Sequence, residues 1–410
     1  MKTARTAILL LATVANVLAQ GGANYTAFGL GQQRTTFGAA YEGLGGAAYA
    51  VPSDYLFGIA NPALWPLVKT TRIQGGYRFN QQRVEQEGAF RAQNNGKLDG
   101  AGLLFALDTS AELAASIGVF PATSVNYVSL RRFQISLPDV GILDGTTTYR
   151  GGGGLTMAYA GFALRVVPGL YAGGALLYGF GLISDQTETT VAADITQRAL
   201  STQNDRLSTV GSRIGLYAEL GDHVRVGMAG TFFRSLQVER LFVYQSFLPN
   251  TIQPTFDTSL TTSFATPMAT TLGGGVTYTH RRLLLTLDGE WSSTEVLTYR
   301  YSRLARAESS FRFSLAASYR GNPAAGQTFG ERVTLNGGVS MQRMPVVMGS
   351  APLDEYAASI GLQIPFGGAA MIDAALIAGV RGNGLPVREE FLRLSLTLSV
   401  GEVWFIPFRW

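Results

Sequence analysis

Short runs of alternating apolar and polar residues recur from about residue 70 to the end of the chain. In Leu392–Val400 every even position carries leucine or valine, and the odd positions carry Arg, Ser and Thr. The stretch 71–79 alternates in the same way, with Ile73 on one face and Arg78 on the other. A two-residue period over about ten residues is typical of a membrane-spanning strand with one face in lipid and the other in a wet lumen.

This alternation predicts an all-β fold, a transmembrane antiparallel β-barrel of about 14 strands. The even count is the one that bacterial barrels usually have. We expect the strands near 70–80, 97–108, 112–127, 149–166, 169–184, 207–219, 223–240, 259–279, 282–300, 308–320, 331–345, 353–365, 369–381 and 388–404.

The predicted connections alternate in length, as barrel turns and loops do. Short links are predicted at 108–111, 167–169, 221–222, 280–281 and 367–368, and longer polar links at 81–96, 128–148, 185–206, 241–258 and 301–307. This alternation predicts that both chain ends face the periplasm.

The N-terminus has the three parts of a signal peptide. Lys2 and Arg5 precede an apolar run from Ala7 to Ala15, and Val17-Leu18-Ala19 supplies a cleavage site. The run is shorter than the ~20 residues that a spanning helix needs. We expect residues 1–19 to be removed on export; the alternative is a short buried helix.

The composition agrees with a barrel in a Gram-negative outer membrane. Charged residues make up 15% of the chain, against about 25% in an average globular protein, and 50 of the 410 residues are glycine. The absence of cysteine excludes disulfides and thiolate metal sites. With a net charge of +4 and no run of basic residues, nucleic acid is not an expected partner.

Residues 20–68 do not have the pattern of spanning strands. They are rich in Gly, Ala and Tyr, and they contain Pro52, Pro62 and Pro66. Since a barrel of fourteen strands needs filling or leaves a channel, we expect this stretch to form a plug in the lumen. The division is then a signal peptide at 1–19, a plug (hatch) at 20–68 and a barrel at 69–410.

Several motifs resemble those of FadL-type outer-membrane channels. The stretch Ala40–Ala47 followed by Asp54 and then Asn61-Pro62-Ala63 resembles the N-terminal hatch of that family. The plug-motif residues are Gly43, Gly45, Gly46, Asp54, Asn61, Pro62 and Ala63. The segments 354–362 and 388–396, with Trp404-Phe405, are similar to FadL-like barrels of the Bacteroidetes group.

The resemblance implies a fourteen-stranded barrel with an N-terminal plug that imports long-chain fatty acids and other hydrophobic molecules. It also implies a partner role for the barrel-assembly machinery during biogenesis, because the aromatic C-terminus is similar to the signal that this machinery reads. Some relatives serve protein secretion or barrel assembly instead, so an accessory or scaffold subunit with a protein partner stays open as the alternative.

Pro121 interrupts a stretch that otherwise has the pattern of the third strand. Proline removes a ladder hydrogen bond and is confined to edges and bulges. In FadL-type channels a kink in the third strand opens a lateral hole, so the resemblance implies a gate at Gly118, Phe120 and Pro121. The alternative is an ordinary bulge. Pro267 is a similar breaker in the eighth strand.

The ligand is expected to bind among the outer loops 81–96, 128–148 and 185–206. Phe133, Ile135 and Leu137 are the best apolar candidates there. Asn61-Pro62-Ala63 either lines the ligand path or fixes a turn of the plug, since Asn before Pro favours turns.

The remaining motifs do not predict an enzyme, a metal site or a cofactor. Gly151–Gly154 has no Lys-Ser/Thr to complete a phosphate loop. His223 and His280 lack the usual further ligands of zinc. Asp288 and Glu290 are interpreted as charges in a wet lumen. The expected partners are outer-membrane lipid and a hydrophobic small molecule.

Overall fold

A computed structural model describes residues 23–404, except for short gaps at 35–36, 87–88, 138–140, 193–196, 249–250, 252, 294–298, 301–304, 323–326 and 367–368. The predicted signal peptide and the last aromatic residues, including Phe405, lie outside this part. Within it, no helix is long and apolar enough to cross a membrane.

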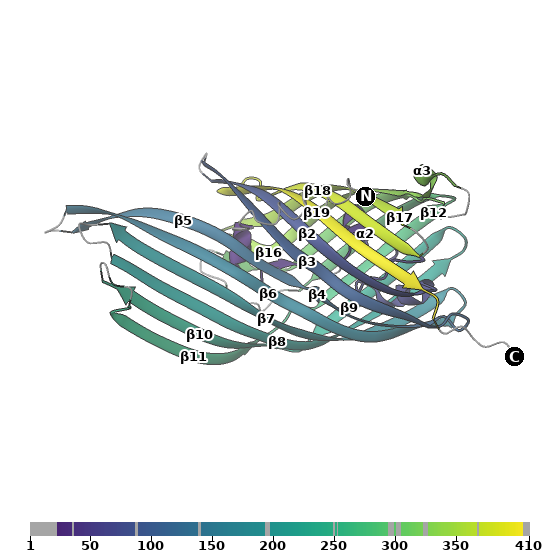
Figure 1. The fold of residues 1–410 in the computed structure, drawn as a ribbon, viewed down its shortest axis with the longest axis horizontal. Coiled ribbons are helices and arrows are strands. Elements are labelled where there is room, and N and C mark those ends of the chain that lie inside the picture. The colour runs from purple at the N-terminus through teal and green to yellow at the C-terminus, as the bar shows by residue number, and fades with distance from the viewer. Residues whose placement is uncertain are drawn as a thin grey trace, which may run out of the picture.

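The wall is a closed antiparallel barrel with fourteen spanning strands (Figure 1). Ten of them are single elements, of which the first nine are β2 (Thr71–Gln86), β3 (Ala89–Asp108), β6 (Gly141–Val167), β7 (Leu170–Ala192), β8 (Gln197–Leu220), β13 (Leu283–Ser292), β16 (Thr334–Met348), β17 (Ala351–Pro365) and β18 (Ala370–Arg381). The last, β19 (Val387–Glu402), pairs with β2 along its length and closes the ring.

The other four spanning strands are each interrupted. They are β4 (Leu113–Pro121) with β5 (Thr123–Leu137), β9 (Val224–Phe233) with β10 (Leu236–Phe247), β11 (Phe256–Thr266) with β12 (Thr271–His280), and β14 (Ala305–Ala307) with β15 (Ser310–Tyr319). Pro121 and Pro267 stand at two of these interruptions. The predicted fold class and strand number are therefore confirmed.

One end of the barrel carries the short connections, and the opposite end carries the long ones. We call them the turn end and the loop end. At the turn end, β6 and β7 are joined by two residues, and so are β12 and β13. The longest link there, between β15 and β16, holds the four-residue helix α3 (Phe329–Arg332). The strand β2 starts at the turn end and β19 finishes there.

The polar stretches that were expected to be outer loops are mostly strand, so that expectation was wrong. The β5–β6, β7–β8 and β10–β11 hairpins continue far past the length needed to cross a bilayer, and β6 alone has 27 residues. They project together at the loop end (Figure 1). These segments are rich in Thr, which suits a pleated surface whether or not lipid covers it.

The alternation in each strand sorts its side chains between lipid and lumen. In β19, Leu394, Leu398 and Val400 are exposed on the outside, whereas Ser395 and Ser399 are fully buried inside. Placing these outward-facing apolar side chains in hydrocarbon is therefore favourable in free energy by about 25 cal/mol for each Å² of apolar surface removed from water.

Residues 23–68, here called the N-terminal segment, lie inside the barrel. The segment contains η1 (Asn24–Ala27), β1 (Gln32–Gln33), α2 (Ala39–Gly43) and η2 (Pro62–Leu67). Helix α2 packs against β16–β19, while η2 packs against β4, β6, β7 and β8 on the other side. A segment that contacts opposite walls must fill the space between them.

Candidate functional site

The barrel wall has a seam between β3 and β5. The ladder between β3 and β4 runs from Asp108↔Leu113 to Ala101↔Val119 and stops there. After the bend at Ala122 the chain continues as β5, which pairs with β6. Among the described residues no backbone pairing joins β5 to the Ala89–Gly100 half of β3. Two strand edges therefore face each other without a shared ladder.

The seam arises from local backbone chemistry. Pro121 has no N–H to donate, and the Ala122 N–H turns instead to the Leu155 carbonyl oxygen at 2.9 Å. On β6 opposite, Gly153 and Gly154 have φ of 109° and 142°, and a Cβ on Gly154 would collide with the Thr123 carbonyl. The Gly151–Gly154 run thus shapes the bend in the wall.

An apolar groove lies on the outer face of the seam. Its volume is about 680 Å³, and Tyr77, Leu98, Val119, Pro121, Leu396 and Leu398 are among its lining residues. Leu98 is 78% exposed. A groove with this lining on the outer wall suits a hydrocarbon chain.

The inner face of the same seam is polar. A cavity of about 40 Å³ is lined by Lys97, Asp99 and Asn126, and it shares Leu98 and Pro121 with the outer groove. The Lys97 ammonium donates to the Ser124 hydroxyl at 2.8 Å, which joins the two strand edges. Leu98 and Pro121, which line both spaces, separate the lumen from the groove.

The N-terminal segment covers the seam from inside. Its strand β1 pairs with β5 at Gln32↔Ser124 and Gln33↔Thr123. The Arg34 N–H donates to the Ala122 carbonyl oxygen at 2.8 Å. A hydrogen bond at 3.0 Å from the Asn126 N–H to the Thr26 hydroxyl adds a further tie.

Aromatic side chains complete this closure. Phe120 is buried and stacks on Phe37 of the N-terminal segment, with ring centroids 6.0 Å apart, and its other neighbour is Tyr159 at 6.3 Å. Gly100 and Gly118 have room for these rings only because they lack Cβ: a Cβ would lie 3.0 Å from Phe37 and 2.8 Å from the Tyr159 hydroxyl, respectively.

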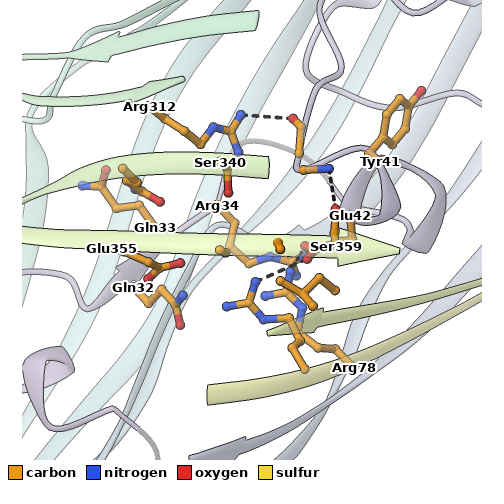
Figure 2. A pocket seen from close by; sticks show the side chains of 17 residues that line it. Gln32, Gln33, Arg34, Tyr41, Glu42, Arg78, Arg312, Ser340, Glu355 and Ser359 are labelled. Carbon is orange, nitrogen blue, oxygen red and sulfur yellow. Dashed lines mark hydrogen bonds and ion pairs between the residues drawn. The ribbon is translucent and has the colours of Figure 1, made fainter. Parts of the chain in front are cut away.

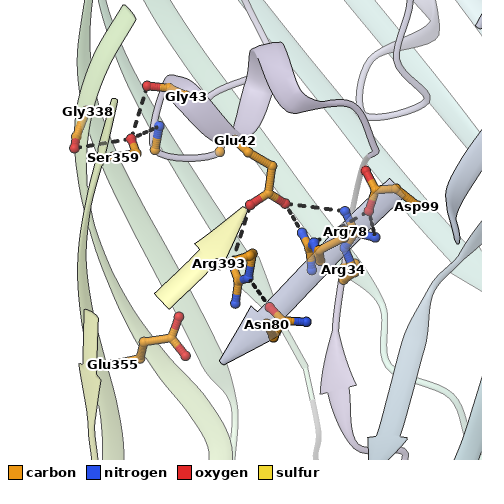
Figure 3. A network of polar contacts seen from close by, with 12 residues as sticks. Arg34, Glu42, Gly43, Arg78, Asn80, Asp99, Gly338, Glu355, Ser359 and Arg393 are labelled. Atoms are coloured by element: carbon orange, nitrogen blue, oxygen red, sulfur yellow. Dashed lines mark hydrogen bonds and ion pairs between the residues drawn. The ribbon is translucent and has the colours of Figure 1, made fainter. Parts of the chain in front are cut away.

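A buried ion-pair network holds the N-terminal segment at the centre of the lumen (Figure 3). We call it the central network; its members are Arg34, Glu42, Arg78, Asp99, Glu355, Arg381, Glu389 and Arg393. Glu42, on α2, pairs with Arg34 at 3.3 Å, with Arg393 at 3.3 Å and with Arg78. One carboxylate therefore joins the segment to two wall strands.

The rest of the network follows the same rule that each arginine has a carboxylate partner. Arg381 contacts Glu355 at 2.5 Å and Glu389 at 3.0 Å, and Glu389 accepts the Asn24 N–H at 2.6 Å. Breaking a buried pair of this kind typically costs about 3–5 kcal/mol, because an uncompensated charge is left behind. The network thus pins the segment in one position.

The space inside the central network is small. A cavity of about 70 Å³ lies between Glu42, Arg78, Arg312 and Glu355 (Figure 2). A volume this small and a lining this charged suit a few water molecules rather than a hydrophobic molecule.

The Asn61-Pro62-Ala63 motif fixes a turn. The Asn61 side chain accepts from the Ala63 N–H at 3.1 Å and donates to the Tyr49 and Leu216 carbonyl oxygens at 2.7 and 3.0 Å. Gly173, Gly215 and Gly227 on the wall have no Cβ to displace this turn. All of these contacts are structural, which matches the turn interpretation of the motif.

The glycines of the motif let α2 approach the wall. Gly43 lies against Gly361, where an added Cβ would be 2.9 Å from the neighbouring Cα. Gly45 and Gly46 have positive φ and end the helix. The Ser359 hydroxyl donates to the Gly43 carbonyl oxygen at 3.0 Å. Asp54 is not part of this contact, since it lies exposed at the turn end.

The apolar candidates Phe133, Ile135 and Leu137 are not in a loop, which corrects that expectation. They lie on β5 and pair with Gly145, Leu143 and Gly141 of β6. They belong to the projecting hairpin, and neither Phe133 nor Ile135 lines the seam groove. The apolar alternation of 133–137 continues β5 into this hairpin, so the stretch is strand and not loop.

The loop end has its own polar contacts. Tyr299 donates to Asp205 at 2.8 Å, and Arg240 holds the same carboxylate at 2.8 and 2.9 Å. Burial and the Asp205 charge raise the pKa of Tyr299, so it remains a neutral donor. The Arg300 guanidinium donates to the Asp185 carboxylate at 2.5 Å and to the Gly29 carbonyl oxygen at 3.0 Å.

The sequence did not reveal two of these arrangements. The charged partners in the central network are up to 351 residues apart in the chain. The only sequence signal for the wall residues among them is their position on the inward-facing side of alternating strands. His223 and His280 have ring centroids 5.5 Å apart, although no group of three metal-ligating side chains occurs in the described ranges.

The sequence profile of the BamG family matches residues 1–410. The chain belongs to the BamG family. No curated protein matches it. This family membership spans the barrel and the N-terminal segment alike.

Solved structures share the fold of this BamG-family barrel at low sequence identity. A Pseudomonas aeruginosa FadL homologue has a TM-score of 0.60 at 11% identity, covering 90% of this chain and 99% of the other. The P. putida toluene transporter TodX gives 0.58 at 14%, covering 90% and 99%. The CymD monoaromatic hydrocarbon channel gives 0.58 at 13%, covering 90% and 98%. The chain therefore has the fold of the FadL-type outer-membrane barrels.

Proposed function

We propose that this barrel passes hydrophobic small molecules, such as long-chain fatty acids, from outside into the outer membrane through the seam beside Pro121. The turn end then faces the periplasm. The observation that carries the proposal is the seam itself, because an apolar groove of about 680 Å³ meets the lumen at Leu98 and Pro121. Three barrels of the same fold are described as hydrophobic-compound channels or transporters or as a FadL homologue.

Passage requires the N-terminal segment to leave the seam. In the closed arrangement Phe37 and β1 cover it from inside. The segment therefore acts as the plug, and its movement at β1 is the step that opens the route. No covalent chemistry and no cofactor take part in this mechanism.

A disulfide that locks β1 to β5 over the seam tests the proposal. The chain has no cysteine, so Gln32→Cys with Ser124→Cys, which face each other in the β1–β5 ladder, forms the only pair. We expect oxidation to reduce uptake of a labelled hydrophobic probe to background and reduction to restore it. The measurement is uptake into proteoliposomes.

The control is a disulfide between two other strands of the wall. Thr277→Cys with Thr286→Cys joins β12 to β13, where the two hydroxyls are 2.9 Å apart, far from β1. This variant should transport alike in both redox states. Unchanged uptake by the oxidised seam variant would exclude lateral passage.

A second candidate function is an accessory subunit of an outer-membrane protein assembly or secretion complex. The resemblance to FadL-like barrels favours it, since some of those relatives serve protein secretion or barrel assembly. The closed lumen and the projecting hairpins also suit a scaffold. Here a defined assembly protein should co-purify in equal amount from native membranes, and depletion of the barrel should impair outer-membrane protein assembly without affecting uptake.

A further inference from the structure

A third internal cavity opens at the turn end, away from the seam. Its volume is about 310 Å³, at the lower end of the range for small-molecule sites. The N-terminal segment forms one side through 51–56, and the turn-end parts of β2, β13 and β15–β18 form the rest. We call it the turn-end cavity.

Three arginines line this cavity: Arg72 on β2, Arg320 after β15 and Arg332 on α3. Arg72 donates only to neutral oxygens, those of Ser399, Thr70 and Ala369. Arg320 donates to the Pro52 carbonyl oxygen at 2.6 Å. The Arg332 Nε is buried and has no hydrogen-bond partner among the residues that the structure describes. Within the part of the chain that the structure describes, none of the three forms an ion pair.

Carboxyl groups near the cavity are fewer than the arginines. Asp54 is in the lining and exposed. Asp373 lies two residues beyond the lining residue Met371 on β18, and neither of its buried oxygens has a hydrogen-bond partner among the described residues. Even with both ionised, an excess of guanidinium charge remains.

A neutral polar side chain is also left without a partner. Asn336, on β16, lines the cavity and is only 7% exposed, yet neither its amide nitrogen nor its oxygen has a hydrogen-bond partner in the described part of the chain. Buried polar groups are normally satisfied, so an exception in a cavity wall points to a ligand that supplies the partner.

The rest of the lining is apolar. Leu44, Val51 and Leu56 come from the N-terminal segment, and Leu284 and Met371 from the wall. A free inorganic anion would gain nothing from these side chains. A molecule with an anionic group and a short apolar chain would use both parts of the lining.

We propose that the turn-end cavity binds an amphiphilic anion, with its carboxylate or phosphate group held by Arg320, Arg332 and Asn336 and its apolar chain against Leu44, Val51 and Leu56. This site lies at the opposite end of the barrel from the projecting hairpins. It goes beyond the proposed passage, and it stands even if the seam never opens.

Equilibrium binding of labelled decanoate to the full-length barrel in nanodiscs tests the proposal, with empty nanodiscs as background. We expect a saturable site that Arg320→Gln or Arg332→Gln weakens about tenfold or more, since a charged hydrogen bond is lost. Dihexanoyl phosphatidate as competitor distinguishes the two headgroups: displacement shows that phosphate is accepted, and failure to displace assigns the site to carboxylates.

Arg206→Gln is the matched control, because Arg206 is 77% exposed at its side chain and lies on β8, outside the cavity lining. Its binding should equal that of the unmodified protein. Heat-modifiable migration on gels verifies that each variant is folded. Equal affinity for decanol and decanoate, or unchanged affinity in both arginine variants, would overturn the proposal.

Discussion

The central network and the turn-end cavity are both rich in arginine, and they differ in how that charge is balanced. Arg381 in the network is 1% exposed and contacts two carboxylates, whereas Arg332 at the turn end has a buried Nε with no partner. A paired buried charge is costly to disturb and holds its neighbours in place. An unpaired one is available to a ligand. The same residue type thus serves to fasten the N-terminal segment in one region and to offer a site in the other.

Removing a paired arginine should have the largest effect. Arg381→Ala leaves Glu355 and Glu389 buried without their partner, and we expect it to lower the free energy of unfolding by about 3–5 kcal/mol. Urea unfolding in detergent, followed by tryptophan fluorescence, measures it. Arg206→Ala, in an exposed pair with Glu239, should change it by no more than about 1 kcal/mol. If the two variants were equal, the central network would not fasten the segment.

Giving the turn-end cavity a carboxylate of its own should sharpen the comparison. Asn336→Asp is nearly isosteric and places a negative charge beside unpaired arginines. We expect little loss of stability and about a tenfold loss of decanoate binding, equivalent to about 1.4 kcal/mol. The converse result, unfolding without loss of binding, would show that Asn336 belongs to the fold and not to the site.

The smallest expected effect is on α3, which carries Arg332. The Thr328 N–H and hydroxyl donate to Glu331 at 2.9 and 2.8 Å and lower the pKa of that carboxyl. Because the folded pKa is depressed, this stabilisation is present above the ordinary glutamate pKa of about 4.3 and is lost as the pH falls through the folded value. Amide hydrogen exchange at 329–332 should therefore become faster as the pH falls than it does in the Glu331→Gln variant. The variant has no carboxyl group at this position to titrate.

The barrel was predictable because its pattern is local. Every spanning strand carries its own two-residue period, and the predicted ranges match observed strands from β2 to β19. The positions of Pro121 and Pro267 were also informative, since proline interrupts a ladder wherever it falls. The predicted loops failed for the same local reason: polar stretches such as 186–190 lack the apolar alternation of a lipid-facing strand, yet they pair with β8.

The sequence by itself determined that this chain forms a fourteen-stranded barrel, which connections are short and, through Pro121 and Pro267, where two of its strands are interrupted. These follow from backbone hydrogen bonding and from the need to separate lipid from lumen along each strand. Only the tertiary structure decided which charges are paired. Glu42 meets Arg393 from 351 residues away, whereas no carboxylate of the described residues pairs with Arg332, because pairing depends on barrel register and on where the N-terminal segment rests.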